Sequence, residues 1–187
     1  MRPMPTGTTA TAGPALSAGS ATATATATRP PVASAAAGAP ILKVSNIEQS
    51  LAFYCGVLGF ELQQRYGPQA AFISAGGYHH HIGLNSWDSE GGSPPPPGTT
   101  GLFHTAILYP TRADLADALK RLAAHGIALD GASDHGVSEA LYLHDPDMNG
   151  VELYWDKPEA QWPRNADGSL AMFTRRLDLN DLIATAN

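Results

Sequence analysis

Cysteine is nearly absent from this 187-residue chain, in which Cys55 is the only example. A single thiol excludes an internal disulfide and any cysteine-rich zinc site. No uninterrupted apolar run approaches the roughly 18 residues that a membrane-spanning helix needs, which predicts a soluble, cytoplasmic protein.

The formal net charge of -6 and the pI of 5.5 provide no attraction to phosphate backbones or anionic lipid. Nucleic acids and membranes are therefore not expected as partners.

Acidic residues are missing from residues 1–38, a segment built mainly from Ala, Thr, Ser, Gly and Pro. Such a composition buries too little apolar surface to offset the entropy lost on ordering, which predicts a disordered, low-complexity tail. The lack of acids, together with Arg2, Arg29 and many hydroxyls, also fits an organelle transit peptide. Both interpretations place the folded domain after this segment.

The remaining chain is long and apolar enough for one globular domain, and its first half predicts a strand, a helix and three strands. Ser45 and Glu48 have the spacing of a capping box that opens the helix, and Gly59 ends it. Turn residues separate the expected strands, which are 41–44 before the helix and 60–66, 70–74 and 78–87 after it.

The same order of elements returns in the second half. A strand at 103–109 precedes a helix that Thr111 and Asp114 open with a second capping box and that Gly126 closes. Three strand-like runs follow, up to residue 155. Two copies of a strand–helix–three-strand unit, each unable to bury a core alone, predict one α+β domain.

The last two strands of the second copy form an expected hairpin. Asp145-Pro146-Asp147 and Asn149-Gly150 are strong turn formers, and the flanking residues are typical of strands. Tyr142 and Glu152 then lie on paired strands, with His135 shortly before them. A histidine, a tyrosine and a carboxylate gathered around one hairpin suffice for metal chemistry.

The doubled unit, with Asp145-Pro146-Asp147-Met148-Asn149-Gly150-Val151-Glu152-Leu153 near its end, resembles the vicinal oxygen chelate superfamily of glyoxalases, extradiol dioxygenases and bleomycin-resistance proteins. The stretches 76–85 and 134–142 are similar to the catechol 2,3-dioxygenase branch. The resemblance implies paired βαβββ units, 39–90 and 101–158, that form a curved mixed sheet around a metal or ligand cleft. Met148 stands where the family prefers glycine, and a positive φ there would cost about 1 kcal/mol.

In this superfamily two histidines and one glutamate hold Fe(II), which leaves three positions open for a bidentate catecholate and oxygen. The resemblance places His104, on the first strand of the second unit, and Glu152, on its last, at metal positions. Fe(II) is therefore the expected metal, with Mn(II), Zn(II) and Ni(II) as alternatives and molecular oxygen as co-substrate.

The first unit departs from the family pattern, because Ala39 stands where the second unit has His104. Either the metal site is degenerate or another side chain completes it. Glyoxalases take a ligand from the last strand of the first unit, which points to His80 and His81. Strand alternation would put His79 and His81 on one face and His80 on the other. We expect His80 to face the cleft as an acid–base residue, with His81 in reserve as the third metal ligand.

The resemblance also implies roles in catalysis. His80 would take a proton from the catechol, because histidine titrates near neutral pH. Tyr142 would donate a hydrogen bond or proton to oxygen that develops charge, and His135 would hydrogen-bond the bound oxygen species. The expected activity is extradiol cleavage of a catechol-type aromatic ring.

Two other functions fit the same sequence. One is a glyoxalase-like lyase or isomerase, and the other is a non-catalytic protein that sequesters a small molecule or antibiotic in a cleft with a degenerate metal site. A homodimer is expected by resemblance, because exposed sheet edges in this fold are commonly covered by a second module. Residues 159–187 are apolar enough in places to form a C-terminal arm over the cleft or a partner subunit.

Overall fold

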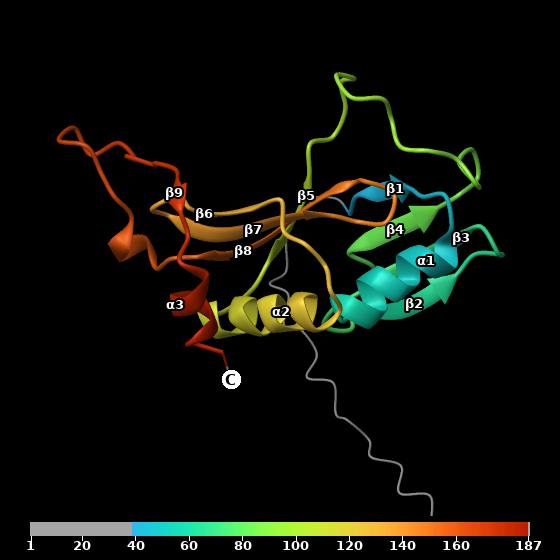
Figure 1. The fold of residues 1–187 in the computed structure, drawn as a ribbon, viewed down its shortest axis with the longest axis horizontal. Coiled ribbons are helices and arrows are strands. Elements are labelled where there is room, and N and C mark those ends of the chain that lie inside the picture. The colour runs from blue at the N-terminus through green and yellow to red at the C-terminus, as the bar shows by residue number, and fades with distance from the viewer. Residues whose placement is uncertain (1–38, 187) are drawn as a thin grey trace, which may run out of the picture.

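The computed structural model describes residues 39–186, so the tail predicted for 1–38 lies outside the described residues. The first unit forms a four-stranded mixed sheet in the order β1-β4-β3-β2 (Figure 1). Its strands are β1 (Ile41–Lys43), β2 (Glu61–Arg65), β3 (Ala70–Ser74) and β4 (Ile82–Asn85). The pairing of β1 with β4 is parallel, and the other two pairings are antiparallel.

The second unit repeats this order in a sheet arranged β5-β8-β7-β6-β9. Its strands are β5 (Thr105–Leu108), β6 (Gly131–Asp134), β7 (Ser138–His144), β8 (Gly150–Asp156) and β9 (Arg175–Arg176). Here β5 pairs in parallel with β8, as β1 does with β4. The repeated topology confirms the predicted α+β fold of paired units.

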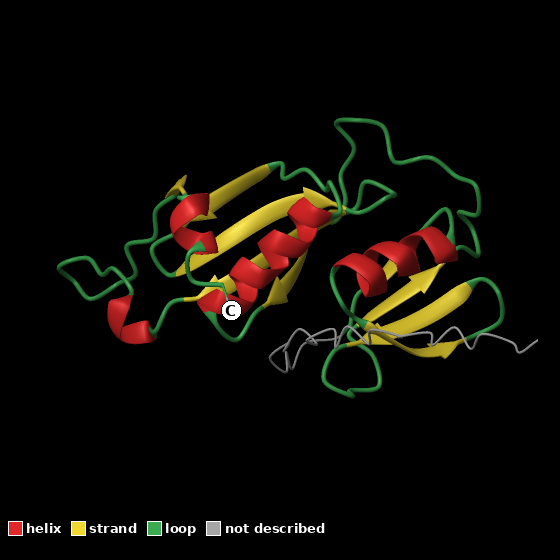
Figure 2. Cartoon of the chain, turned by 60° about the horizontal axis from the view of Figure 1, so that its bottom comes forward, coloured by secondary structure: helices red, strands yellow, loops and turns green. Residues whose placement is uncertain are grey.

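One helix covers each sheet. The helix of the first unit begins as α1 (Ile47–Leu51) and continues as the π-helical turn η1 (Ala52–Val57), whereas α2 (Arg112–Ala124) is a regular α-helix. Figure 2 shows both helices on the same side of the molecule, each over its own sheet. A long loop, 86–104, connects β4 to β5. No helix in the described part of the chain is long and apolar enough to cross a membrane.

The two helix starts differ in how they are capped. Thr111 forms the predicted capping box, because its side chain accepts from the Asp114 backbone N–H and the Asp114 carboxylate accepts from the Thr111 N–H. The capping box predicted at Ser45 is wrong by one residue: Asn46 is the N-cap and accepts from Gln49 N–H at 3.0 Å. The Ser45 N–H instead donates to the Asp147 carboxylate, at 3.0 Å, in the second unit.

A single hydrophobic cluster includes residues of both units. Leu42 and Leu84 of the first sheet belong to it, together with Leu141 and Leu153 of the second, and all four side chains are buried. Their burial against the helices supplies the main stabilisation of the fold. The domain therefore depends on both copies, as the doubled pattern predicted.

The strand predicted at 78–87 is much shorter in the structure, because β4 begins only at Ile82. Gly76 and Gly77 both have positive φ and turn the chain away from β3. His79, His80 and His81 consequently lie in the connecting loop. Strand alternation therefore does not place these histidines on opposite faces of the sheet.

The C-terminal segment is folded against the second unit. It contains the 3-10 turn η2 (Glu159–Gln161), strand β9 and helix α3 (Leu179–Ile183). Strand β9 pairs antiparallel with β6, and the buried side chains of Leu177 and Leu182 belong to the common core. We call residues 159–183 the C-terminal arm.

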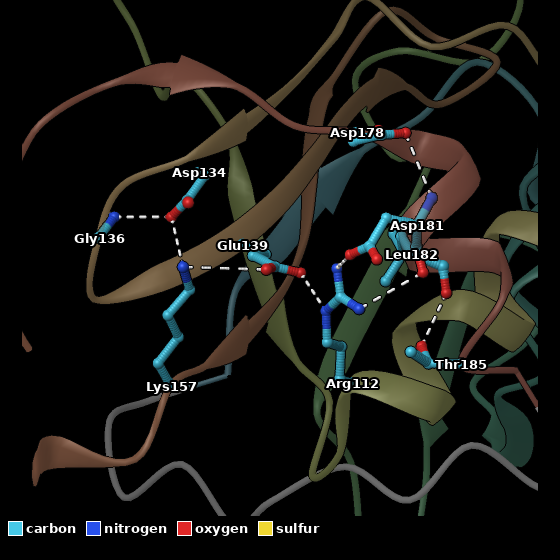
Figure 3. Close-up of polar contacts among 9 residues, drawn as sticks. All are labelled: Arg112, Asp134, Gly136, Glu139, Lys157, Asp178, Asp181, Leu182 and Thr185. Atoms are coloured by element: carbon cyan, nitrogen blue, oxygen red, sulfur yellow. Dashed lines mark hydrogen bonds and ion pairs between the residues drawn. The ribbon is translucent and has the colours of Figure 1, made fainter. Parts of the chain in front are cut away.

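An ion pair between Arg112 and Asp181 links the arm to α2, next to further ion pairs of the second unit (Figure 3). Arg112 at the start of α2 donates to Glu139 on β7 at 2.7 Å and to Asp181 on α3 at 2.7 Å. Lys157, after β8, lies 2.7 Å from Asp134 and 3.8 Å from Glu139. Since Glu139 is only 7% exposed, its two cations compensate a charge that is almost removed from water.

Candidate active site

His104 and Glu152 lie side by side at the edge where β5 and β8 run in parallel. The distance from His104 Nε2 to Glu152 Oε2 is 2.9 Å, and their side chains keep 30% and 15% of their accessible surface. Ala106 is the register partner of Glu152, so His104 precedes β5 on the same face. The two predicted metal positions are thus adjacent and partly open to solvent.

A glycine allows this close approach. A Cβ atom on Gly150, the first residue of β8, would overlap the carbonyl oxygen of Phe103 and come within 3.1 Å of the His104 backbone. Any larger residue would push His104 away from the strand that carries Glu152. The small size of Gly150 therefore lets His104 approach Glu152, and the same residue ends the turn before β8.

Tyr142 and His135 extend the pair into a chain of hydrogen bonds. Tyr142 is the register partner of Glu152 and donates its hydroxyl proton to Glu152 Oε1 at 3.0 Å. His135 Nε2 lies 2.8 Å from the same hydroxyl oxygen. The polar series His104–Glu152–Tyr142–His135 therefore crosses the sheet from the start of β5, over β8 and β7, to the end of β6.

The opposite face of this sheet is apolar. Val151 and Leu153, which alternate with Glu152 along β8, are buried in the core. Tyr154 shares the face of Glu152, as strand alternation predicted. The two-residue period of β8 thus separates the packing face of the sheet from its polar face.

The negative charge of Glu152 influences the neighbouring groups. Burial, reinforced by the charge of Glu152 and its hydrogen bond, raises the pKa of Tyr142 to about 12. Burial and then the Glu152 charge also raise the pKa of Asp156. Tyr142 therefore keeps its proton throughout the physiological pH range and can act as a hydrogen-bond donor.

His135 is held by the turn between β6 and β7 and by the C-terminal arm. Gly136, which follows it, has a φ of +80°, and a Cβ there would come within 2.7 Å of the Phe173 ring and 2.9 Å of Pro163. Phe173 N–H donates to the His135 carbonyl at 3.2 Å. The other ring nitrogen, Nδ1, lies 3.1 Å from Thr174 Oγ1 and 3.3 Å from the Phe173 carbonyl oxygen.

The structure does not bring the first-unit histidines into this series. His81 Nδ1 accepts from Ala75 N–H at 3.2 Å and lies 2.9 Å from Ser74 Oγ. Burial, followed by the charges of His79 and His80, lowers the pKa of His81. The His80 ring packs on Phe72 at 5.1 Å, and its Nδ1 lies 2.7 Å from His79 Nδ1.

These side chains fit a metal in part. His104 Nε2 and Glu152 Oε2 are an imidazole nitrogen and a carboxylate oxygen, the donor types that iron, manganese and zinc accept, and they are close enough to share one ion. Among residues 39–186, however, no three His, Cys, Asp or Glu side chains gather in a group that could hold a metal. The described chain thus provides two protein ligands together, and His81 as a third ligand stays a prediction.

Sequence reasoning missed the residues behind His135. Neither Thr174 nor the Asp134–Lys157 pair was expected at the site, although Asp134 also accepts from Gly136 N–H at 2.8 Å and so fixes the turn that carries His135. Thr174 is 39 positions from His135 in the chain. The sequence predicted only a C-terminal arm in this region, and no local pattern indicated its partner.

The model of the Glyoxalase/Bleomycin resistance protein/Dioxygenase superfamily matches residues 36–153, which include the first unit, most of the second and all the predicted site residues. The chain therefore belongs to this superfamily, as the resemblance indicated.

Two curated relatives are dioxygenases by name. The chain is 42% identical over 145 residues to a catechol-2,3-dioxygenase of Bacillus subtilis, a match that covers 78% of this chain and 50% of the relative. It is 35% identical over 118 residues to biphenyl-2,3-diol 1,2-dioxygenase 3 of Rhodococcus globerulus, covering 62% of this chain and 60% of the relative. The chain thus spans only about half to three fifths of the length of these relatives.

A solved structure supports the fold. A glyoxylase/bleomycin resistance protein/dioxygenase domain from Frankia sp. EAN1pec superposes with a TM-score of 0.55 at 20% identity, covering 68% of this chain and 96% of the other. At this identity the likeness concerns the architecture alone.

Proposed function

We propose that this chain is a metal-dependent, extradiol dioxygenase-like enzyme that opens a catechol-type aromatic ring. The observation that carries the proposal is the hydrogen-bonded series His104–Glu152–Tyr142–His135 on one face of the second sheet. The names of the two curated relatives support the same reaction class. Because the chain spans only part of their length, the activity is proposed from the site as well as from the likeness.

His104 and Glu152 would hold the metal, with Fe(II) as the proposed ion and the remaining positions left to further ligands. A metal bound there would act as a Lewis acid that favours the catecholate form of the substrate near neutral pH. The 15–30% exposure of the two side chains leaves the site accessible from solvent. His81 is retained as the proposed third ligand.

Tyr142 supplies a proton donor beside the metal position. Because its pKa is raised to about 12, its hydroxyl is protonated at the pH at which a catechol would react. Its proton now points to Glu152 and can turn toward a substrate oxygen once the carboxylate engages a metal. Such a donor stabilises negative charge that develops on oxygen in the transition state.

His135 places a second polar group next to the hydroxyl of Tyr142. Its Nε2 is within hydrogen-bond distance of Tyr142, so a proton can pass between the two groups without a large movement. His80 is the proposed base for the substrate, and its half-buried ring packs on Phe72 in the first unit. The assignment predicts that removal of His80 lowers turnover and leaves metal content unchanged.

Oxygen uptake is the direct test. Chain loaded anaerobically with Fe(II) should consume oxygen in proportion to added catechol, and it should leave the hemithioacetal of glutathione and methylglyoxal intact. Loss of the hemithioacetal without oxygen uptake would assign the chain to the glyoxalase-like alternative instead.

One observation favours a second function. Because no three ligand side chains gather in the described part of the chain, the same polar face can serve a protein that only binds small molecules. Equal affinity for catechol with and without a chelator, measured by calorimetry and accompanied by no oxygen uptake, would support this binding function.

A further inference from the structure

The C-terminal arm contacts the candidate site at His135, and two of these contacts are to the imidazole ring. Thr174 Oγ1 lies 3.1 Å from His135 Nδ1, and the Phe173 carbonyl oxygen lies 3.3 Å from the same nitrogen. Both contacts come from the chain immediately before β9. The backbone pairings Ser133↔Arg176 and Asp134↔Arg175 fix this segment beside the His135 turn.

Hydrogen-bond accounting assigns the protons along the series. The Tyr142 hydroxyl carries one proton, and it donates this proton to the Glu152 carboxylate. The Tyr142 oxygen must therefore be the acceptor for His135, and Nε2 of His135 must carry a proton. In a neutral imidazole the other nitrogen, Nδ1, is then a bare acceptor.

The two neighbours of Nδ1 differ in what they can offer. A carbonyl oxygen can only accept a hydrogen bond, so the Phe173 carbonyl cannot donate to an unprotonated Nδ1. Instead, a lone pair of the carbonyl oxygen faces the lone pair of the nitrogen. A threonine hydroxyl rotates freely and can donate, so Thr174 is the group that satisfies the Nε2–H tautomer.

We propose that Thr174 is a positioning residue that keeps neutral His135 in its Nε2–H tautomer, aimed at Tyr142. The role in turnover rests on the proposed dioxygenase function, whereas the role in setting the tautomer follows from the contacts alone. The C-terminal arm thereby becomes part of the active site without touching substrate. A hydroxyl at this position can also accept from Nδ1–H when the ring is doubly protonated, so the contact survives proton transfer.

Removing the hydroxyl should reverse the tautomer. In Thr174→Val the Phe173 carbonyl, which can only accept, remains beside Nδ1 and favours a proton on that nitrogen. The Nε2 atom would then accept from Tyr142 and draw its proton away from Glu152. Thr174→Ser restores a hydroxyl and should restore the original arrangement.

The test uses nitrogen NMR of the imidazole rings in the full chain, kept metal-free to avoid paramagnetic broadening and held near pH 8, above the ordinary histidine pKa of about 6.5. His135→Gln identifies the His135 signals. Wild type and Thr174→Ser should show a protonated Nε2 and a bare Nδ1, whereas Thr174→Val should show a protonated Nδ1. Thr185→Val is the matched control, because Thr185 also lies near the C-terminus but donates to the Leu182 carbonyl.

Turnover provides the second readout. In the iron-loaded enzyme, Thr174→Val should lower kcat for catechol about tenfold, the lower end of the range for groups that orient catalytic residues, because Thr174 is exposed and water can replace part of its contact. KM should change little. Unaltered His135 signals in Thr174→Val would overturn the proposal. A reversed tautomer in a protein without any oxygenase activity would uphold the positioning role and refute the proposed function.

Discussion

Tyr54 of the first unit donates its hydroxyl proton to Asp145 of the second, at 3.0 Å, in a place where both side chains are buried. The Asp145 carboxylate also accepts from the backbone N–H groups of Asp147 and Asn149 and from the Asn149 side chain, which closes the β7–β8 turn. Burial and the Asp145 charge raise the pKa of Tyr54 well above its ordinary value. The Tyr54–Asp145 hydrogen bond thus links the helix of the first unit to the hairpin that carries Glu152.

Tyr54→Phe should therefore destabilise the whole domain. Loss of a hydrogen bond to a buried carboxylate predicts a decrease of about 2 kcal/mol in the free energy of unfolding, measurable by urea denaturation. Tyr109→Phe is the matched control, since the Tyr109 hydroxyl is also buried but lies beside Arg121 and makes no hydrogen bond to a carboxylate. Equal losses in the two variants would show that the link to Asp145 contributes nothing.

Met148 is the one non-glycine residue with positive φ in the described part of the chain, at 62°. The resemblance marked this as a position where the family prefers glycine, and Met148→Gly should relieve the strain and stabilise the protein by about 0.5–1 kcal/mol. Met172→Gly provides the comparison, because Met172 is similarly exposed (59% against 56%) but has ordinary backbone angles. A thermal shift of the same sign in both variants would contradict this explanation.

Asp134 should contribute to acid sensitivity. Burial tends to raise its pKa, but the hydrogen bond from Lys157, with help from Gly136 N–H and nearby positive charge, outweighs this and leaves the pKa lowered. A carboxylate with a lowered folded-state pKa stabilises the fold above its ordinary value near 4 and loses that contribution as the pH falls through the lowered value.

Asp134→Asn should therefore make the unfolding free energy less dependent on pH between about pH 5 and pH 2. Asp88→Asn is the control, because its pair with Lys43 is mostly exposed, at 76% and 66%. An unchanged pH profile in Asp134→Asn would show that Lys157 does not stabilise the ionised carboxylate.

Tyr142→Phe tests the proposed proton donor. The variant keeps the ring but loses the hydroxyl between Glu152 and His135, so kcat for catechol should fall roughly 100-fold while iron content is retained. Tyr154→Phe removes a hydroxyl from the same sheet face, where it makes no hydrogen bond to Glu152, and should have a much smaller effect. Comparable rates for wild type and Tyr142→Phe would remove Tyr142 from the mechanism.

The sequence predicted the parts of the fold that depend on local periodicity. The doubled order of elements, the second capping box and the hairpin that pairs Tyr142 with Glu152 are all confirmed. The structure places His104, just before β5, beside Glu152 on β8, and their role as metal ligands stays a prediction.

Long-range and loop-dependent features were harder to predict. The strand expected through the three histidines is a loop instead, because two glycines with positive φ interrupt it before Ile82. The contact between Thr174 and His135 depends on how β9 returns to the edge of the sheet, which no short pattern in the sequence specifies. The ligand from the first unit was equally hard to predict. Ala39 supplies no ligand, and the three histidines lie in a loop, where strand alternation does not determine which way a side chain points.

Metal retention tests the proposed metal site at His104 and Glu152. The full chain, loaded anaerobically with Fe(II) and freed of excess ion, should retain near-stoichiometric iron, and Glu152→Gln and His104→Ala should lose it, since both remove a proposed ligand. Glu48→Gln, which alters an exposed carboxylate paired with Arg65, should retain iron like wild type. Equal iron content in wild type and Glu152→Gln, or none in wild type, would contradict a metal site at His104 and Glu152.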